Sequence, residues 1–224
     1  MPKTYKKSYS FWYRNSLTLV FTLLFIGTLV AQAFTGLNVH NEDLQEAGKP
    51  ILSFSTYLCS GHFIAATFEN FESEFLQMFL YVILTVKLRQ IGSAESKSLN
   101  KKEEVDRMPK ASADAPWPVK KGGWILKIYE NSLSICFVIL FLTSWYFHFY
   151  GSWQDYNVEQ GLKNLPHKSM IDYICNANFW FETFQNWQSE FLSVASIVFL
   201  TIYLRQKGSP ESKPVDAPYM ETGK

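Results

Sequence analysis

The segment TFENFESEFL (Thr67–Leu76) decides the fold, because the chain repeats it as TFQNWQSEFL (Thr183–Leu192), with seven of ten positions identical at an offset of 116 residues. Extended without a gap over residues 13–97 and 129–213, the alignment has 31 identities in 85 positions. Both copies end in a second shared phrase, LRQIGSAESK in the first and LRQKGSPESK in the second. Polar identities in a fixed register indicate an internal duplication.

Each copy contains one long and one short apolar run. The four runs cover residues 17–34, 75–88, 133–150 and 191–204. About 20 helical residues cross a hydrocarbon core of about 30 Å, so the short runs need residues from their polar flanks to cross. The first run also has a basic start and an Ala31-Gln32-Ala33 stretch that resembles a signal-peptide cleavage site. Its internal copy has no such stretch, which favours a membrane span.

The pattern predicts an all-α membrane protein with four transmembrane helices, arranged as two tandem helical-hairpin repeats in parallel orientation. The predicted organisation is repeat 1 at 1–97 (spans about 15–35 and 70–90), a cytoplasmic linker at 98–123, repeat 2 at 124–213 (spans about 131–151 and 186–206), and a disordered tail at 214–224. Charge, Pro and Ala dominate the linker, as is typical of segments without a core of their own.

Lysine and arginine set the predicted orientation. They are frequent in the N-terminal flank, the linker and the C-terminal flank, and sparse in the two outward loops, 36–70 and 152–186, one of which lies in each repeat. The positive-inside rule then places both termini and the linker in the cytoplasm, with the chain in the cell's inner (plasma) membrane and the lipid bilayer as its surroundings. A net charge of +1 and the absence of a basic module disfavour nucleic acid as a partner.

The repeated phrase has a helix-start interpretation, because Asn is a preferred N-cap and acidic residues suit the first helical turn. Arginine near a helix end suits the C-terminal partial charge and the inner interface. The predicted caps and interface anchors are Asn70, Ser73, Asn186, Ser189, Arg89 and Arg205.

Glu74 and Glu190 are the deepest acids of the two short spans. Because an ionisable group at that depth is costly unless it is paired, hydrated or protonated, they form a candidate functional pair. The two parallel repeats are expected to be related by a pseudo-two-fold axis along the membrane normal, and the pair is expected to meet across it. His62, Glu69 and Glu72 lie on nearly one helical face and are weaker candidates for divalent metal ligands. No compact ligand motif is present, so the sequence predicts no metal site and no cofactor.

Cys59 and Cys175 occupy equivalent outward positions and allow a disulfide, with two unpaired thiols as the alternative. His148 lies among Trp145, Tyr146 and Phe149, and is interpreted as a member of the interfacial aromatic belt.

No nucleophile elbow, phosphate loop or Cys/His metal set is present, which disfavours an enzyme. The leading expectation is a non-enzymatic membrane protein with a structural or interaction role, whose partner is another membrane protein or a second copy of itself. The alternatives are a small oligomeric transporter or channel that uses Glu74 and Glu190, and a metal- or acid-assisted membrane enzyme.

Two stretches resemble a known family: SGHFIAATFENFESEFLQMFLYVILTVKLRQIGSAESK (60–97) and FWFETFQNWQSEFLSVASIVFLTIYLRQKGSPESKPV (179–215). They are similar to bacterial multi-pass membrane proteins grouped as a domain of unknown function, and the resemblance covers nearly the whole chain. Phe71 is a departure, since Trp187 leads us to expect Trp there. The resemblance implies a membrane location, and it implies no activity, substrate or site residue.

Overall fold

The computed structural model describes residues 9–223, and within that range every regular element is a helix. The elements are α1 (Phe11–Arg14), α2 (Ser16–Glu46), α3 (Phe54–Tyr57), α4 (Gly61–Lys87), η1 (Glu104–Asp106), α5 (Trp117–Lys121), α6 (Gly123–Glu130), α7 (Ser132–Leu162), α8 (Met170–Ile174) and α9 (Ala177–Tyr203). The predicted all-α class is confirmed at this level.

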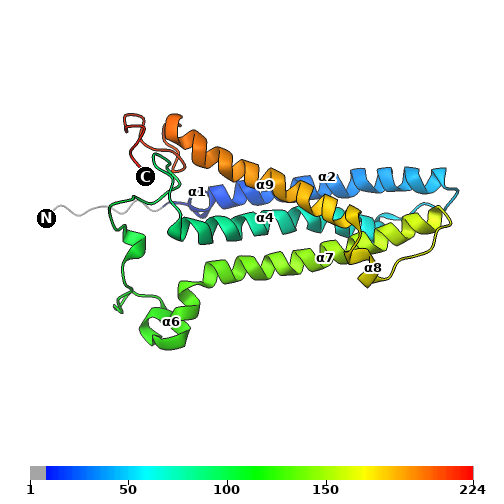
Figure 1. Ribbon diagram of the computed structural model, residues 1–224, viewed down its shortest axis with the longest axis horizontal. Helices are drawn as coiled ribbons and strands as arrows, with labels where there is room; N and C mark the ends of the chain where they lie inside the picture. The colour runs from blue at the N-terminus through cyan, green and yellow to red at the C-terminus, as the bar shows by residue number, and fades with distance from the viewer. Residues whose placement is uncertain (1–8, 224) are drawn as a thin grey trace.

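Four long helices run side by side along the length of the molecule (Figure 1). The chain runs along α2, returns along α4, runs out again along α7 and returns along α9. The linker with α6, and the C-terminal tail, therefore lie at the same end as α1, and α8 lies at the opposite end (Figure 1). Helix α4 contacts α2, α7 and α9, so it is the central helix that joins the two halves.

Glycines allow α4 and α7 to approach closely. A Cβ added at Gly61 would lie 2.7 Å from the carbonyl oxygen of Gly151, and one added at Gly151 would lie 2.5 Å from the backbone nitrogen of Ala65. Small residues at a helix crossing bring the two backbones together in this way. The repeats place Ala177 and Thr35 at the equivalent positions, so this contact belongs to α4 and α7 alone.

Helices α2 and α7 are long and apolar enough to cross a membrane by length and composition. Each has 31 residues, or about 46 Å of helix at ~1.5 Å per residue, which exceeds a hydrocarbon core of about 30 Å. In an apolar 18-residue segment of each helix, 6% of the α2 residues and 11% of the α7 residues are buried inside the protein, so both segments are largely exposed. They therefore differ from the core helices of a soluble domain.

The helices start earlier than the sequence predicts. Ser60 caps α4 by accepting from the backbone N–H of Phe63, and Asn176 caps α9. The prediction that Asn70 and Asn186 are N-caps is wrong, because both lie inside helices, where their side-chain amides donate to carbonyls four residues back. Ser73 and Ser189 likewise donate to carbonyls three residues back within the same helices. The polar residues that precede the two short apolar runs belong to α4 and α9, and part of them, such as Glu72, is buried between the helices.

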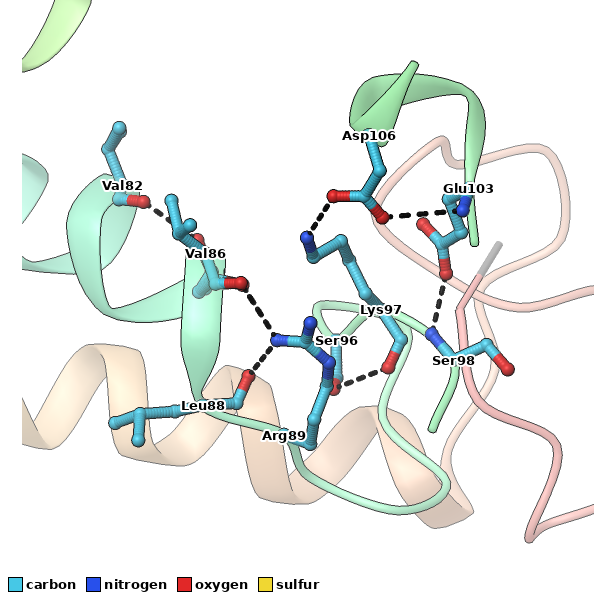
Figure 2. Close-up of polar contacts among 10 residues, drawn as sticks. Val82, Val86, Leu88, Arg89, Ser96, Lys97, Ser98, Glu103 and Asp106 are labelled. Carbon is cyan, nitrogen blue, oxygen red and sulfur yellow. Dashed lines mark hydrogen bonds and ion pairs between the residues drawn. The ribbon is translucent and has the colours of Figure 1, made fainter. Parts of the chain in front are cut away.

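Arg89 and Arg205 lie just beyond the C-caps of α4 and α9, Leu88 and Leu204. The guanidinium of Arg89 donates to the carbonyls of Val86 and Leu88 at 3.1 and 2.8 Å (Figure 2), and Arg205 repeats the pattern at its own helix end. These bonds satisfy carbonyls that have no partner within the helix, as expected for a basic residue at this position.

The linker and the tail are tied to the end of α4. Lys97 forms a 2.6 Å ion pair with Asp106 (Figure 2), which lowers the pKa of Asp106. The tail, expected to be disordered, is hydrogen-bonded as far as Gly223, whose backbone N–H donates to the Ser93 carbonyl at 3.0 Å. The buried ammonium of Lys213 supports this course by donating to three tail carbonyls, those of Pro218, Tyr219 and Glu221.

Candidate metal centre

A buried Glu–His pair lies where α4, α7 and α9 meet. Glu72 of α4 is 1% exposed, and its Oε2 lies 2.6 Å from Nδ1 of His148 on α7, which is 0% exposed. The other oxygen, Oε1, accepts a hydrogen bond of 2.9 Å from the indole N–H of Trp187 on α9. Three helices from both repeats thus place one polar group each in a single buried network.

The tautomer of His148 follows from the charge of Glu72. When Glu72 is a carboxylate, which only accepts, Nδ1 of His148 carries the proton of their hydrogen bond. Nε2 then presents a lone pair, yet it has no hydrogen-bond partner among the described residues. Buried nitrogens without a partner are rare in native structures and need an explanation.

Two more carboxylates, those of Glu69 and Glu182, lie near the His148 imidazole. Oε2 of Glu69 on α4 lies 3.8 Å from Nε2, too far for a hydrogen bond. Glu182 on α9 completes the group, in which one ligand atom from each of the three residues lies within 4.8 Å of the other two. Burial and the nearby Glu69 raise the pKa of the Glu182 carboxyl, which precedes the predicted span 186–206.

This donor set fits a divalent cation. One neutral imidazole and two carboxylates suit Zn²⁺ and its first-row neighbours. Tetrahedral zinc with bonds of about 2.0–2.1 Å sets its ligand atoms about 3.4 Å apart, so these atoms, now within 4.8 Å of one another, would come closer by up to about 1.4 Å. Glu72 would not touch the metal; it would accept the N–H on the far side of the His148 ring, which orients a metal-binding histidine and raises its basicity.

A cavity of about 170 Å³ adjoins the cluster. Glu69 and Glu182 line it together with His62, Asp155 and Glu159. The cavity is lined by residues from the N-terminal halves of α4 and α9 and the C-terminal half of α7. These parts of the three helices lie at the end of the bundle opposite the linker (Figure 1).

The structure separates the weak metal candidates of the sequence. Glu69 and Glu72 both contribute to the centre, but His62 does not, because its Nδ1 pairs with the Tyr57 hydroxyl at 3.0 Å and its ring faces His40. Burial lowers the pKa of His62.

The Glu74–Glu190 pair is brought together, since the carboxyl of Glu190 lies within hydrogen-bonding reach of Glu74. Beside it, the Gln77 amide of α4 donates to the Glu190 carbonyl at 2.7 Å and to Ser193 Oγ at 2.5 Å, which joins α4 to α9.

Cys59 and Cys175 are free, exposed thiols, so the disulfide alternative is not formed here.

Sequence reasoning missed three residues of the centre: His148, Glu182 and Trp187. The interpretation of His148 as a belt residue is wrong, because its side chain is buried and paired. One usable signal was the set of differences between the repeats, since His148 stands where repeat 1 has Gln32 and Glu182 stands where it has Ala66. The duplication therefore carries a single such centre.

These observations define an all-helical protein with two candidate membrane-spanning helices and a buried polar centre shared by its two halves. The chain belongs to the family described as "Domain of unknown function (DUF6766)", whose family model matches residues 8–224. No curated protein and no solved structure matches the chain.

Proposed function

We propose that the protein is an integral membrane protein that binds a divalent transition-metal cation at Glu69, His148 and Glu182. The observation that carries this proposal is the unpartnered Nε2 of His148, which is fully buried and lies 3.8 Å from Glu69, in an imidazole that is grouped with the carboxylates of Glu69 and Glu182. Neighbouring carboxylates repel one another, and a cation bound between them and the imidazole lone pair would remove this repulsion. The arrangement therefore favours cation binding.

The proposed topology has four spans in two parallel hairpins in a bacterial inner membrane, with the linker and both termini on its cytoplasmic side. The exposed apolar side chains of the long helices support it, among them Leu17 (71% exposed) and Phe21 (65%), because water-facing patches of that kind are rare on soluble monomers. Exposed Trp12 and Trp124 at the linker end match an inner interfacial belt. The metal centre then lies toward the outer side, and we propose a binding role instead of catalysis.

Metal binding to the purified full chain tests the proposal. Equilibrium dialysis with Zn²⁺ in detergent, followed by metal analysis, is expected to give one ion per chain. Glu69→Gln and His148→Gln, which insert the amides that the other repeat carries at these positions, are expected to abolish binding. Glu72→Gln is expected to keep the stoichiometry and weaken the affinity about 10- to 100-fold, because the carboxylate that orients the His148 imidazole is lost.

The repeat supplies a matched control. Gln185→Ala changes the residue equivalent to Glu69, which is exposed on α9 and outside the group of candidate ligand atoms, so binding is expected to be unchanged. If the unaltered chain binds no Zn²⁺, or if Glu69→Gln and His148→Gln both retain full binding, the proposal is wrong.

A second candidate, transport by an oligomer, is favoured by the contact between Glu74 and Glu190. Acidic side chains inside membrane spans mark ion pathways. Proton or cation flux in proteoliposomes that is lost in both Glu74→Gln and Glu190→Gln would support this role. Flux equal to that of empty vesicles would refute it.

A further inference from the structure

Polar stripes on three helices converge in the cavity beside the metal centre. On α7, His148, Ser152, Asp155 and Glu159 follow one another at intervals of four, three and four residues, which places them on one helical face. Ser152, Asp155 and Glu159 line the cavity, and His148 lies at the inner end of the stripe. The facing helices add His62 and Glu69 from α4, and Asn178 and Glu182 from α9.

Exposure falls steadily along the α7 stripe. The Glu159 side chain is 56% exposed, Asp155 is half-buried and His148 is 0% exposed. The eleven-residue interval from His148 to Glu159 corresponds to about 16 Å of helix at ~1.5 Å per residue. The stripe thus leads from solvent at the outer end of α7 to the unpartnered nitrogen.

The size and the lining of the cavity suit the passage of a cation. A space of 170 Å³ accommodates roughly five or six water molecules at about 30 Å³ each, enough for a partly hydrated ion. Four carboxyl groups line the wall, belonging to Glu69, Asp155, Glu159 and Glu182. Hard oxygen ligands exchange readily with the water of a divalent ion, and walls of one charge raise the local concentration of the opposite charge.

We propose that this cavity is the loading route by which a hydrated divalent cation reaches His148, with Glu159 and then Asp155 as its first contacts. The inference rests on the proposed metal-binding function. The Lys163 ammonium lies 3.1 Å from Glu159, but both side chains are more than half exposed. Such a pair is weak and easily exchanged, so Lys163 slows the approach of a cation without closing the route.

Stopped-flow binding of Co²⁺ to the full chain tests the route, because the visible spectrum of Co²⁺ reports both its arrival and its final ligands. For Asp155→Asn combined with Glu159→Gln, we expect the association rate at low salt to fall about tenfold or more, with the spectrum of the bound ion unchanged. Glu159→Gln alone, at an exposed position, should slow association severalfold without affecting the fold. Lys163→Gln should change the rate in the opposite direction.

The matched control removes two equal charges outside the cavity. Glu42→Gln with Glu46→Gln, both exposed at the outer end of α2, should leave the association rate within about twofold of that of the unaltered chain. Equal rates in the cavity variant and this control would overturn the route, as would a changed spectrum, which would make Asp155 a ligand. If the unaltered chain binds no Co²⁺ or Zn²⁺, the proposed function fails and the route fails with it, a result that is distinct from the other two.

Discussion

The hydrogen bond from Trp187 to Glu72 gives a quantitative test of the buried network. Trp187→Phe inserts the aromatic residue type that repeat 1 carries at position 71 and removes only the indole N–H and part of one ring. Glu72 is 1% exposed, so water cannot replace the lost donor. A hydrogen bond to a charged group contributes about 1.5–3 kcal/mol, and we expect a loss of about 2–3 kcal/mol in the free energy of unfolding.

The measurement is equilibrium unfolding in mixed micelles followed by far-UV circular dichroism, because indole fluorescence changes with the substitution itself. In a Glu72→Gln background the acceptor is neutral, and Trp187→Phe should cost about 1 kcal/mol. The double-mutant cycle should therefore show a coupling free energy of about 1–2 kcal/mol.

The control is Trp180→Phe, which removes an indole N–H that donates to the neutral carbonyl of Ile174 at 2.7 Å. We expect a loss of about 1 kcal/mol, with no coupling to Glu72. If Trp187→Phe costs no more than Trp180→Phe and is additive with Glu72→Gln, then Glu72 is not held as a buried carboxylate, and the assignment of its role fails.

Three further predictions concern topology, packing and pH. In intact cells, a membrane-impermeant maleimide should label Cys59 and Cys175 without prior reduction, since both are free and exposed at the proposed outer end. Gly151→Ala places a Cβ 2.5 Å from a backbone nitrogen of α4 and should destabilise by at least about 1–3 kcal/mol, whereas Gly27→Ala, with nothing within 4 Å, should be neutral or slightly stabilising. Burial lowers the pKa of His62 below 6.5, so the unfolded chain takes up this proton first, and stability should fall as the pH drops from 6.5 through the lower folded-state pKa.

Each of these has its own contrary outcome. If the two cysteines are labelled only after the membrane is permeabilised, the topology is the inverse of the proposed one. Equal effects of the two glycine substitutions would mean that α4 and α7 are not in backbone contact. His62→Asn, which inserts the residue of repeat 2 at position 178, should flatten the pH dependence, and an unchanged slope would assign it to the neighbouring His40, whose pKa burial also lowers.

The all-helical class and the helix ends at Arg89 and Arg205 could be read from the sequence, because apolar length and end charges are local signals. The starts of α4 and α9 could not be predicted from the sequence. The polar residues before the short runs resemble a surface loop, but Glu69, Glu72 and Glu182 face a shared interior, so charge there marks an inward face instead of a helix end.

The site itself depends on contacts that local spacing does not contain. Glu72 meets His148 because Gly61 and Gly151 let α4 cross α7 closely, over a separation of 76 residues between the two partners. Aromatic neighbours made His148 resemble an interfacial residue. The departures from the repeat, where one half has a titratable group and the other an amide or alanine, are the sequence feature that best indicates the centre.

X-ray absorption of the Zn²⁺-loaded full chain tests the central claim most directly. The account predicts a first shell with a single imidazole nitrogen and carboxylate oxygens at about 2.0–2.2 Å, and loss of the imidazole contribution in His148→Gln. A shell with two imidazoles would place the ion at His40 and His62, and sulfur in the shell would place it at a cysteine. Either result would contradict a metal centre at Glu69, His148 and Glu182.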